Sequence, residues 1–147
     1  MSWFPDMGTV TMIAEGDHVR AVGWLSDQHP FPLGDASPEF LERLKEFCNR
    51  WGDGLEPLAW GLLMGPHQCE FCRGFMATGN IGIPCGAILF VAPEMVAHYV
   101  EVHQYAPPSL FVASILTAPL PGTPEYRDAV AVFRAVHMQN CSTKQVD

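Results

Sequence analysis

Two pairs of metal-ligand residues constrain this chain more than any other feature of its sequence. The first pair, Cys69 and Cys72, lies in the stretch GPHQCEFCRG (65–74). The second pair, His98 and His103, follows 26 and 31 residues after Cys72. A structural Zn²⁺ ion takes four such ligands, often as two separated pairs. If all four bind one ion, the two segments must fold against each other.

The spacing within each pair fits a zinc site. Cys-x-x-Cys is the spacing of a zinc knuckle, and Gly74 allows a tight turn in which backbone N–H groups point at the sulfurs. The His-x4-His spacing falls within the range of zinc fingers. At about 100° per residue, however, His98 and His103 lie roughly 140° apart around an ideal helix. Both can therefore reach one ion only if the end of the helix is distorted.

His67 is a competing ligand, because it precedes Cys69 by only two residues. We favour the set with His103 over the set with His67, since dispersed pairs close a structural site better. If His103 binds the ion, His67 is left as a group that supports the ligands or as an exposed reactive side chain.

Three interpretations without a structural metal stay open. The cysteines can be ordinary buried residues, and the histidines can bond helix carbonyls or pair with Glu94 and Glu101. A thioredoxin-type redox pair would need its CxxC at the start of a helix, whereas a hairpin pattern follows Cys72 here. Of the other cysteines, Cys85 is interpreted as a spare thiol and Cys48 as a core residue.

The pattern around these pairs predicts an α+β fold, with a small antiparallel sheet or hairpin and about four helices. Strands are expected over 18–25 and 56–65 and on either side of turns at 78–80 and 84–86. A helix over 38–50 should begin with Ser37 as N-cap and Pro38 at its first position. Another should begin at Pro93 and run to 105, and two more are expected over 108–116 and about 124–138. The order knuckle, hairpin, helix is that of a treble-clef-like zinc unit, by analogy of arrangement.

Length and composition favour one ordered domain over residues 1–147. Its zinc-binding core is expected over about 60–117, and the tail 140–147 is expected to be flexible. Hydrophobic residues make up 48% of the chain and charged residues only 16%, which suffices for a buried core. The longest apolar stretches are far shorter than the roughly 20 residues of a membrane span, and no secretory signal pattern opens the chain. We expect a cytoplasmic protein.

The charge balance limits the partners. The chain has 16 acidic and 8 basic residues, a net charge of −8, and its basic residues are scattered. Nucleic acids and anionic membranes are bound by basic patches, so neither is expected as a partner. A protein partner, and a basic one in particular, is favoured. Oligomeric state is not predicted.

Three stretches carry a resemblance to a family: VGWLSDQHPFPLG, GPHQCEFCRG and FVAPEMVAHYVEVHQYAPPSLF. Over roughly residues 22–117, the chain resembles an uncharacterised family of small bacterial proteins with an HxCxxC element, an aliphatic strand that ends in Ala-Pro, and the motif HYVxxHxYxPPxxF. The family has no established activity. The resemblance implies that one constellation contains His67, Cys69, Cys72, His98, His103, Tyr105, Pro107 and Pro108.

These observations predict a small acidic protein with a structural zinc, which acts through protein–protein contacts, for example as an immunity protein or a regulator. The alternative is a zinc-dependent hydrolase or nuclease, in which Glu70 or Glu101, or else His67, activates a metal-bound water. The HExxH motif, the zinc deaminase signature, the GxSxG elbow and Gly-rich phosphate loops are all absent from the sequence.

Overall fold

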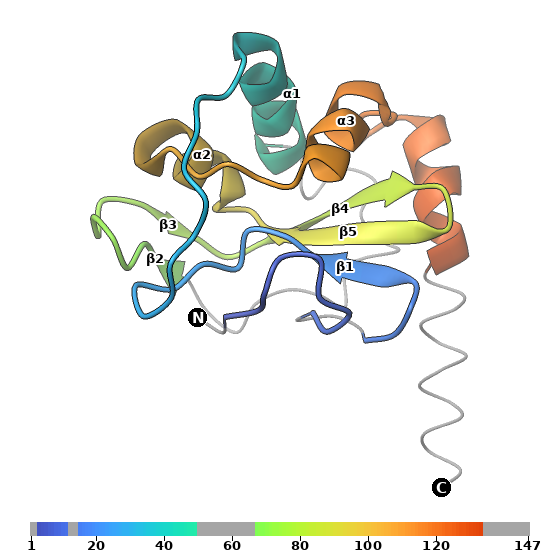
Figure 1. Ribbon diagram of the computed structural model, residues 1–147. Coiled ribbons are helices and arrows are strands. Elements are labelled where there is room, and N and C mark those ends of the chain that lie inside the picture. Colours follow the sequence, from blue (N-terminus) through green and yellow to red (C-terminus); the bar gives the residue numbers. More distant parts are fainter. Residues whose placement is uncertain (1–2, 12–14, 50–66, 134–147) are drawn as a thin grey trace, which may run out of the picture.

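The computed structural model describes residues 3–11, 15–49 and 67–133, which form an α+β fold (Figure 1). The elements in chain order are β1 (Val19–Ala21), α1 (Pro38–Asn49), β2 (His67–Gln68), β3 (Met76–Ala77), β4 (Asn80–Cys85), β5 (Ile88–Pro93), α2 (Val96–His103) and α3 (Ser109–Thr117). A fourth helix in this part of the chain begins at residue 124 and is described to 133. The predicted fold class is confirmed. The predicted strand over 56–65, residues 134–138 of the last predicted helix and the tail lie outside the described residues.

The described strands form two small sheets. β4 and β5 pair as an antiparallel hairpin, from Asn80 opposite Pro93 to Cys85 opposite Ile88, and β1 joins β5 in parallel in the order β1-β5-β4. Gly86 opens the two-residue turn of this hairpin with a φ of 58°, a value that glycine adopts without strain. β2 and β3 form a separate two-stranded hairpin beyond the end of this sheet (Figure 1).

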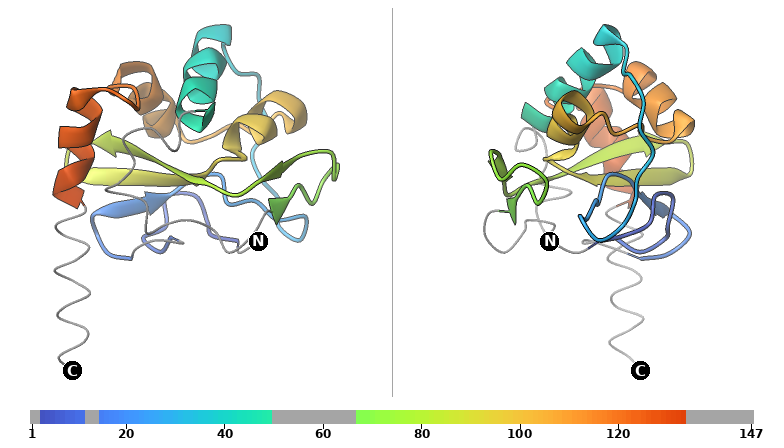
Figure 2. Two further views of the ribbon diagram at one scale, coloured as in Figure 1. Left: turned by 180° about the vertical axis from the view of Figure 1, so that it is seen from behind. Right: turned by 60° about the vertical axis from the view of Figure 1, so that its left-hand side comes forward.

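The helices gather on one face of the three-stranded sheet, and the N-terminal segment runs along its other side (Figure 2). The core between these layers includes the fully buried side chains of Trp24, Phe90 and Phe111. Tyr126, in the helix that begins at residue 124, donates a hydrogen bond from its hydroxyl to the Gly82 carbonyl of β4 at 2.7 Å. None of the described helices combines the length and the apolar character that a membrane crossing needs.

Helix α1 begins as its sequence predicts. The Ser37 hydroxyl accepts a hydrogen bond from the backbone N–H of Phe40 at 3.2 Å, which satisfies one of the free N–H groups at the start of a helix. Phe40, Leu44 and Cys48 lie on the buried face of α1. The prediction that Cys48 is a core residue is confirmed.

The predicted start of α2 at Pro93 was wrong. Pro93 is instead the last residue of β5, and α2 begins at Val96. The reason lies in the next residue, because the backbone N–H of Glu94 donates to the Gly79 carbonyl at 2.8 Å and so continues the contact with the neighbouring strand. Because proline has no backbone N–H, it can end a strand without leaving an unpaired hydrogen-bond donor.

Three other predicted boundaries differ from the structure. The segment 78–79 does not turn a hairpin but links β3 of the small sheet to β4 of the larger one. Pro84 and Cys85 still pair with β5, so the turn of that hairpin is at 86–87. The strand expected over 18–25 ends at Ala21, and two residues later Gly23 adopts a φ of 79°, outside the range of a strand.

Candidate metal centre

The first ligand pair lies in the loop that joins β2 to β3. The backbone N–H of Cys69 donates to the Phe75 carbonyl at 2.9 Å, and the N–H of Arg73 donates to the Cys69 carbonyl at 2.9 Å. Arg73 has a φ of 56°, which turns the chain sharply after Cys72. The N–H of Gly74 then points at the Cys72 sulfur at 3.4 Å. This is the tight turn, with a backbone N–H group directed at sulfur, that the knuckle spacing predicts.

The second pair lies on α2, which ends in a wide turn. The backbone N–H of Gln104, which has a φ of 57°, bonds to the carbonyl of Tyr99, and the N–H of Tyr105 reaches the same carbonyl at 3.1 Å. These bonds span five and six residues, whereas an α-helical bond spans four. A wider turn advances by less than 100° per residue, so it rotates His103 back toward the side of the helix that carries His98. The distortion that the sequence required is present.

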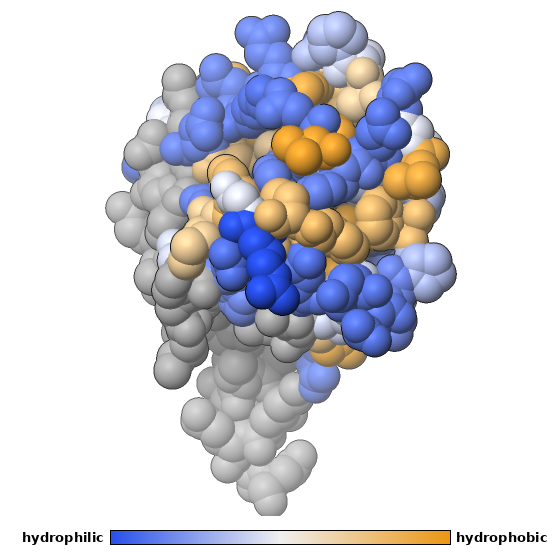
Figure 3. Space-filling view, turned by 90° about the vertical axis from the view of Figure 1, so that its left-hand side faces the viewer, coloured by the Kyte–Doolittle hydropathy of each residue, from blue (hydrophilic) through white to orange (hydrophobic). Residues whose placement is uncertain are grey.

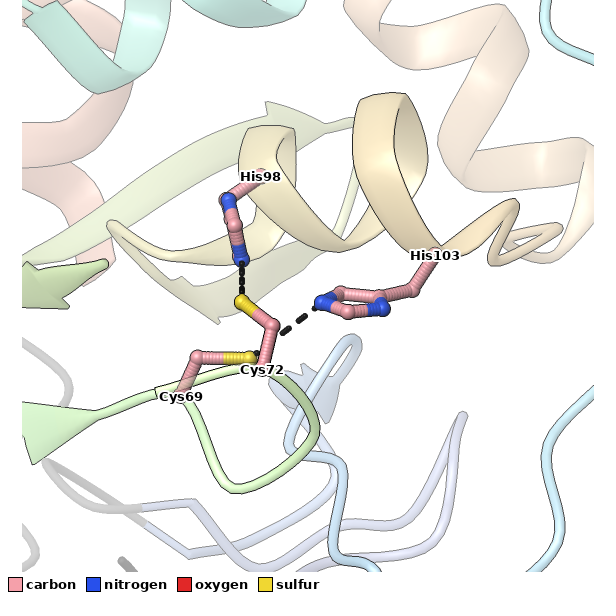
Figure 4. Close-up of side chains that lie close together, drawn as sticks. All are labelled: Cys69, Cys72, His98 and His103. Carbon is pink, nitrogen blue, oxygen red and sulfur yellow. Dashed lines mark hydrogen bonds between the residues drawn. The ribbon is translucent and has the colours of Figure 1, made fainter. Parts of the chain in front are cut away.

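The two pairs meet in one cluster (Figure 4). The Nε2 atom of His98 lies 3.4 Å from the sulfur of Cys72, and the Nε2 atom of His103 lies 3.4 Å from the sulfur of Cys69. All four donor atoms lie within 4.8 Å of one another, so the cluster could hold a metal ion. Cys69 is buried, the two histidines are half-buried and Cys72 is exposed.

The surroundings act differently on the two sides of the cluster. Burial raises the pKa of the Cys69 thiol, and the backbone N–H groups of Cys72 and Phe71 oppose this shift because they favour the thiolate. Burial and the neighbouring His103 lower the pKa of His98. The neutral imidazole is the form that binds metals, so His98 is suited to that role at neutral pH.

Aromatic rings pack against both histidines. The ring of Phe75 stacks on His98, with the centroids 4.7 Å apart and the planes 10° apart. Phe71 contacts His103 at 5.3 Å and the buried ring of Tyr99 at 5.8 Å. These contacts restrict the orientation of the imidazole rings. These contacts were not predicted from the sequence, where the one available signal is that Phe71 and Phe75 lie on either side of Cys72.

The other candidate residues lie outside the cluster. His67 is in β2, opposite Ala77, and is not among the four clustered side chains. Glu70 accepts a hydrogen bond from the backbone N–H of Asp27 at 3.1 Å.

The last carboxylate candidate, Glu101, forms an ion pair with Lys45 of α1. Thus none of the groups of the catalytic alternative, His67, Glu70 and Glu101, belongs to the cluster of four donor atoms, and both carboxylates have another partner.

The remaining residues of the HYVxxHxYxPPxxF motif follow His103 in the chain. Tyr105 is buried, donates its hydroxyl to Asp6 at 2.7 Å and forms a β-bridge with Leu33. Pro108 occupies the position before the first residue of α3, and Pro107 precedes it. These residues fix the chain as it leaves the wide turn of α2.

Comparison with known proteins identifies a family. No curated protein and no solved structure matches the chain. The model of one protein family matches residues 2–116, which include both pairs of clustered side chains. That match covers more than half of the chain, and so the chain belongs to the family described as Domain of unknown function (DUF7919).

Proposed function

We propose that Cys69, Cys72, His98 and His103 bind one structural Zn²⁺ ion and that the protein acts through contacts with other proteins. The observation that carries this proposal is the convergence of the four donor atoms. Zinc bonds of about 2.3 Å to sulfur and 2.0–2.1 Å to nitrogen place neighbouring donors of a tetrahedron roughly 3.6 Å apart. Both sulfur–nitrogen distances here are 3.4 Å. Two thiolates and two imidazoles are also a donor set that favours zinc.

A structural role is favoured over a catalytic one. A catalytic zinc keeps one position for water and needs a nearby base, whereas a structural zinc has four protein ligands. Four donors are available here, and Glu70 and Glu101 are bonded elsewhere. The ion would join the β2–β3 hairpin to α2, two parts of the chain that are separated by the β4–β5 hairpin.

The proposed action through protein contacts is supported by the net charge of the chain and by apolar side chains on its surface. The net charge of −8 suits a basic protein partner, such as the target of an immunity protein or a regulator in the cytoplasm. Figure 3 looks onto the side where β2, β3 and α2 lie, and apolar side chains gather there between polar ones. Phe75, Met76 and Val102 are exposed large apolar residues of the hairpin and of α2. Contiguous exposed apolar patches with polar surroundings are typical of protein contact surfaces.

The ligand set can be tested with two histidine variants, His103→Ala and His67→Ala. We expect one zinc per chain in the wild type and in His67→Ala, and loss of zinc in His103→Ala, because only His103 belongs to the cluster. Metal content is measured by mass spectrometry on the purified chains. X-ray absorption then gives the number of sulfur and imidazole ligands, which is two of each for the structural site and three in total for a catalytic site with a bound water.

Other results would change the assignment. Retention of zinc in His103→Ala with loss in His67→Ala would move the fourth ligand to His67. A wild-type chain that holds no metal, and whose thermal stability does not respond to a chelator, would refute the structural zinc.

A further inference from the structure

A pocket adjoins the candidate metal centre. It has a volume of about 370 Å³ and lies between α1, α2 and the loop that precedes β3. His98 belongs to both the cluster and the pocket wall, and Phe75, which stacks on His98, forms another part of that wall. The remaining lining residues are Lys45, Cys48, Asn49, Glu94, Ala97 and Glu101.

The pocket contains one carboxylate without a counter-charge. Glu101 is paired with Lys45, so these two charges offset each other. The Glu94 carboxylate has no hydrogen-bond or ion-pair partner among the described residues, and burial raises its pKa. A half-buried carboxylate without a partner is destabilising, because burial removes part of its hydration and no hydrogen bond or counter-charge compensates for the loss. Such a group is typical of a binding site in which the ligand supplies the missing partner.

Part of the pocket wall is apolar and could contact an alkyl chain. Phe75 is 38% exposed, and Ala97 and Cys48 line the same pocket. A long basic side chain has matching parts, since it carries a cationic head on an apolar stem that packs against apolar surface. Its charge also complements a chain with a net charge of −8.

We propose that this pocket binds a lysine or arginine side chain of a partner protein, with the cationic head paired to Glu94 and the stem packed against Phe75. This inference rests on the proposed function and names the chemistry of the partner. It also makes recognition depend on the metal. A metal that binds His98 fixes its ring, and the stacked Phe75 then keeps its place in the pocket wall. By linkage, removal of the metal weakens the binding of the basic group.

The test uses the zinc-loaded full chain and two probes of equal stem length, Nα-acetyl-lysine methylamide and Nα-acetyl-norleucine methylamide. They share the four-carbon stem and differ in the ammonium group. We expect the lysine probe to shift the NMR signals of Ala97 and Glu94 with a dissociation constant on the order of millimolar. The norleucine probe should bind at least fivefold more weakly, and the arginine analogue should bind like lysine.

Three variants sharpen the test. Glu94→Gln keeps the shape of the side chain and should weaken binding of the lysine probe at least fivefold. Glu125→Gln removes the same charge from an exposed position on the helix that begins at residue 124, and should leave binding unchanged. Lys45→Met releases Glu101 from its ion pair and should strengthen binding.

The outcomes separate this inference from the zinc assignment, because metal content is measured on each sample. If zinc-loaded wild-type chain binds lysine and norleucine equally, or Glu94→Gln binds like the wild type, the pocket proposal is refuted while the zinc site stands. If a chain without metal binds the lysine probe through Glu94 as tightly as the zinc-loaded chain does, the coupling to the metal is refuted while the pocket stands, and the zinc assignment is still decided by metal content and the response to a chelator.

Discussion

Cys69 and Cys72 stand three residues apart but in different surroundings. Cys69 is fully buried, and its backbone N–H and carbonyl both take part in the turn of the knuckle. Cys72 is exposed and accepts a hydrogen bond from the N–H of Gly74. A bound cation would offset the desolvation of a thiolate at Cys69, which burial otherwise disfavours. The buried cysteine therefore gains most from the ion.

Replacement of Cys69 by serine should show this dependence. Serine is similar in size but does not replace a thiolate on zinc, so metal affinity should fall by more than the roughly 10- to 100-fold that loss of a supporting hydrogen bond causes. The melting temperature should fall with it. Competition with a chromophoric chelator and thermal unfolding measure the two effects. Cys85→Ser, a half-buried cysteine outside the cluster, is the matched control and should keep the metal. Equal affinity in both variants would remove Cys69 from the site.

The raised pKa of Glu94 should make the free energy of unfolding fall as the pH rises. The folded chain binds the Glu94 proton more tightly than the unfolded chain does, because burial disfavours the carboxylate. This contribution to stability is complete below the pKa of the unfolded state and is lost as pH rises through the folded pKa. Glu94→Gln should therefore be more stable than the wild type at neutral pH, and the difference should shrink on acidification. Denaturant unfolding at pH 4 and 7 measures it, and a difference that grows on acidification would contradict the assignment.

At the scale of elements, the sequence predicted what depends on local signals. The cap of α1 was predictable because Ser37 and Pro38 act on their own neighbours. The end of β5 was not, because the bond from the Glu94 N–H to the Gly79 carbonyl depends on where β4 lies. The wide turn at the end of α2 was required by the spacing of the two histidines, but no residue there marks it as glycine or proline would.

Gly23 shows how closely the chain approaches α2 near its first turn. It has a φ of 79°, and a Cβ atom at this position would lie 2.7 Å from the Cγ2 atom of Val96. Gly23→Ala should cost more than about 1 kcal/mol, since an unfavourable φ and a steric clash add together. Gly86→Ala isolates the first effect, because Gly86 also has a positive φ but nothing within 4 Å of its Cβ position.

Denaturant unfolding should therefore rank Gly23→Ala below Gly86→Ala in stability. A second comparison adds Val96→Ala, which removes the clashing methyl and should recover part of the loss in the Gly23→Ala background. Equal stability of the two glycine variants would mean that Val96 moves aside freely, and that the start of α2 is not held by this contact.

Across the molecule, the sequence predicted the four side chains that cluster but not the residues that surround them. Ligand pairs are visible in a sequence because their spacing is local. The stacking of Phe75 on His98 and the pocket beside it depend on how the knuckle packs against α2. This packing cannot be predicted from local sequence patterns. Glu94 was considered as a partner for the helix histidines, whereas it lies just before α2 and lines the pocket.

Two parts of the molecule differ in how much they depend on the metal. The three-stranded sheet itself carries buried side chains, such as those of Ile83, Phe90 and Val91. The β2–β3 hairpin has only two paired residues in each strand, and Met76 on it is exposed. A hairpin of this size is not stable on its own in water. We therefore expect the metal to stabilise the hairpin directly and the sheet through the rest of the fold.

Hydrogen exchange after chelation should separate these parts. The N–H of Cys69, bonded to the Phe75 carbonyl, and the N–H of Gln104 at the end of α2 should exchange much faster without the metal. The N–H of Leu89, bonded to the His18 carbonyl, and that of Val22, bonded to the Val91 carbonyl, should stay protected because β5, which takes part in both bonds, remains buried. Equal acceleration at all four amides would mean that the metal holds the whole fold as one cooperative unit, and that the buried core is insufficient without it.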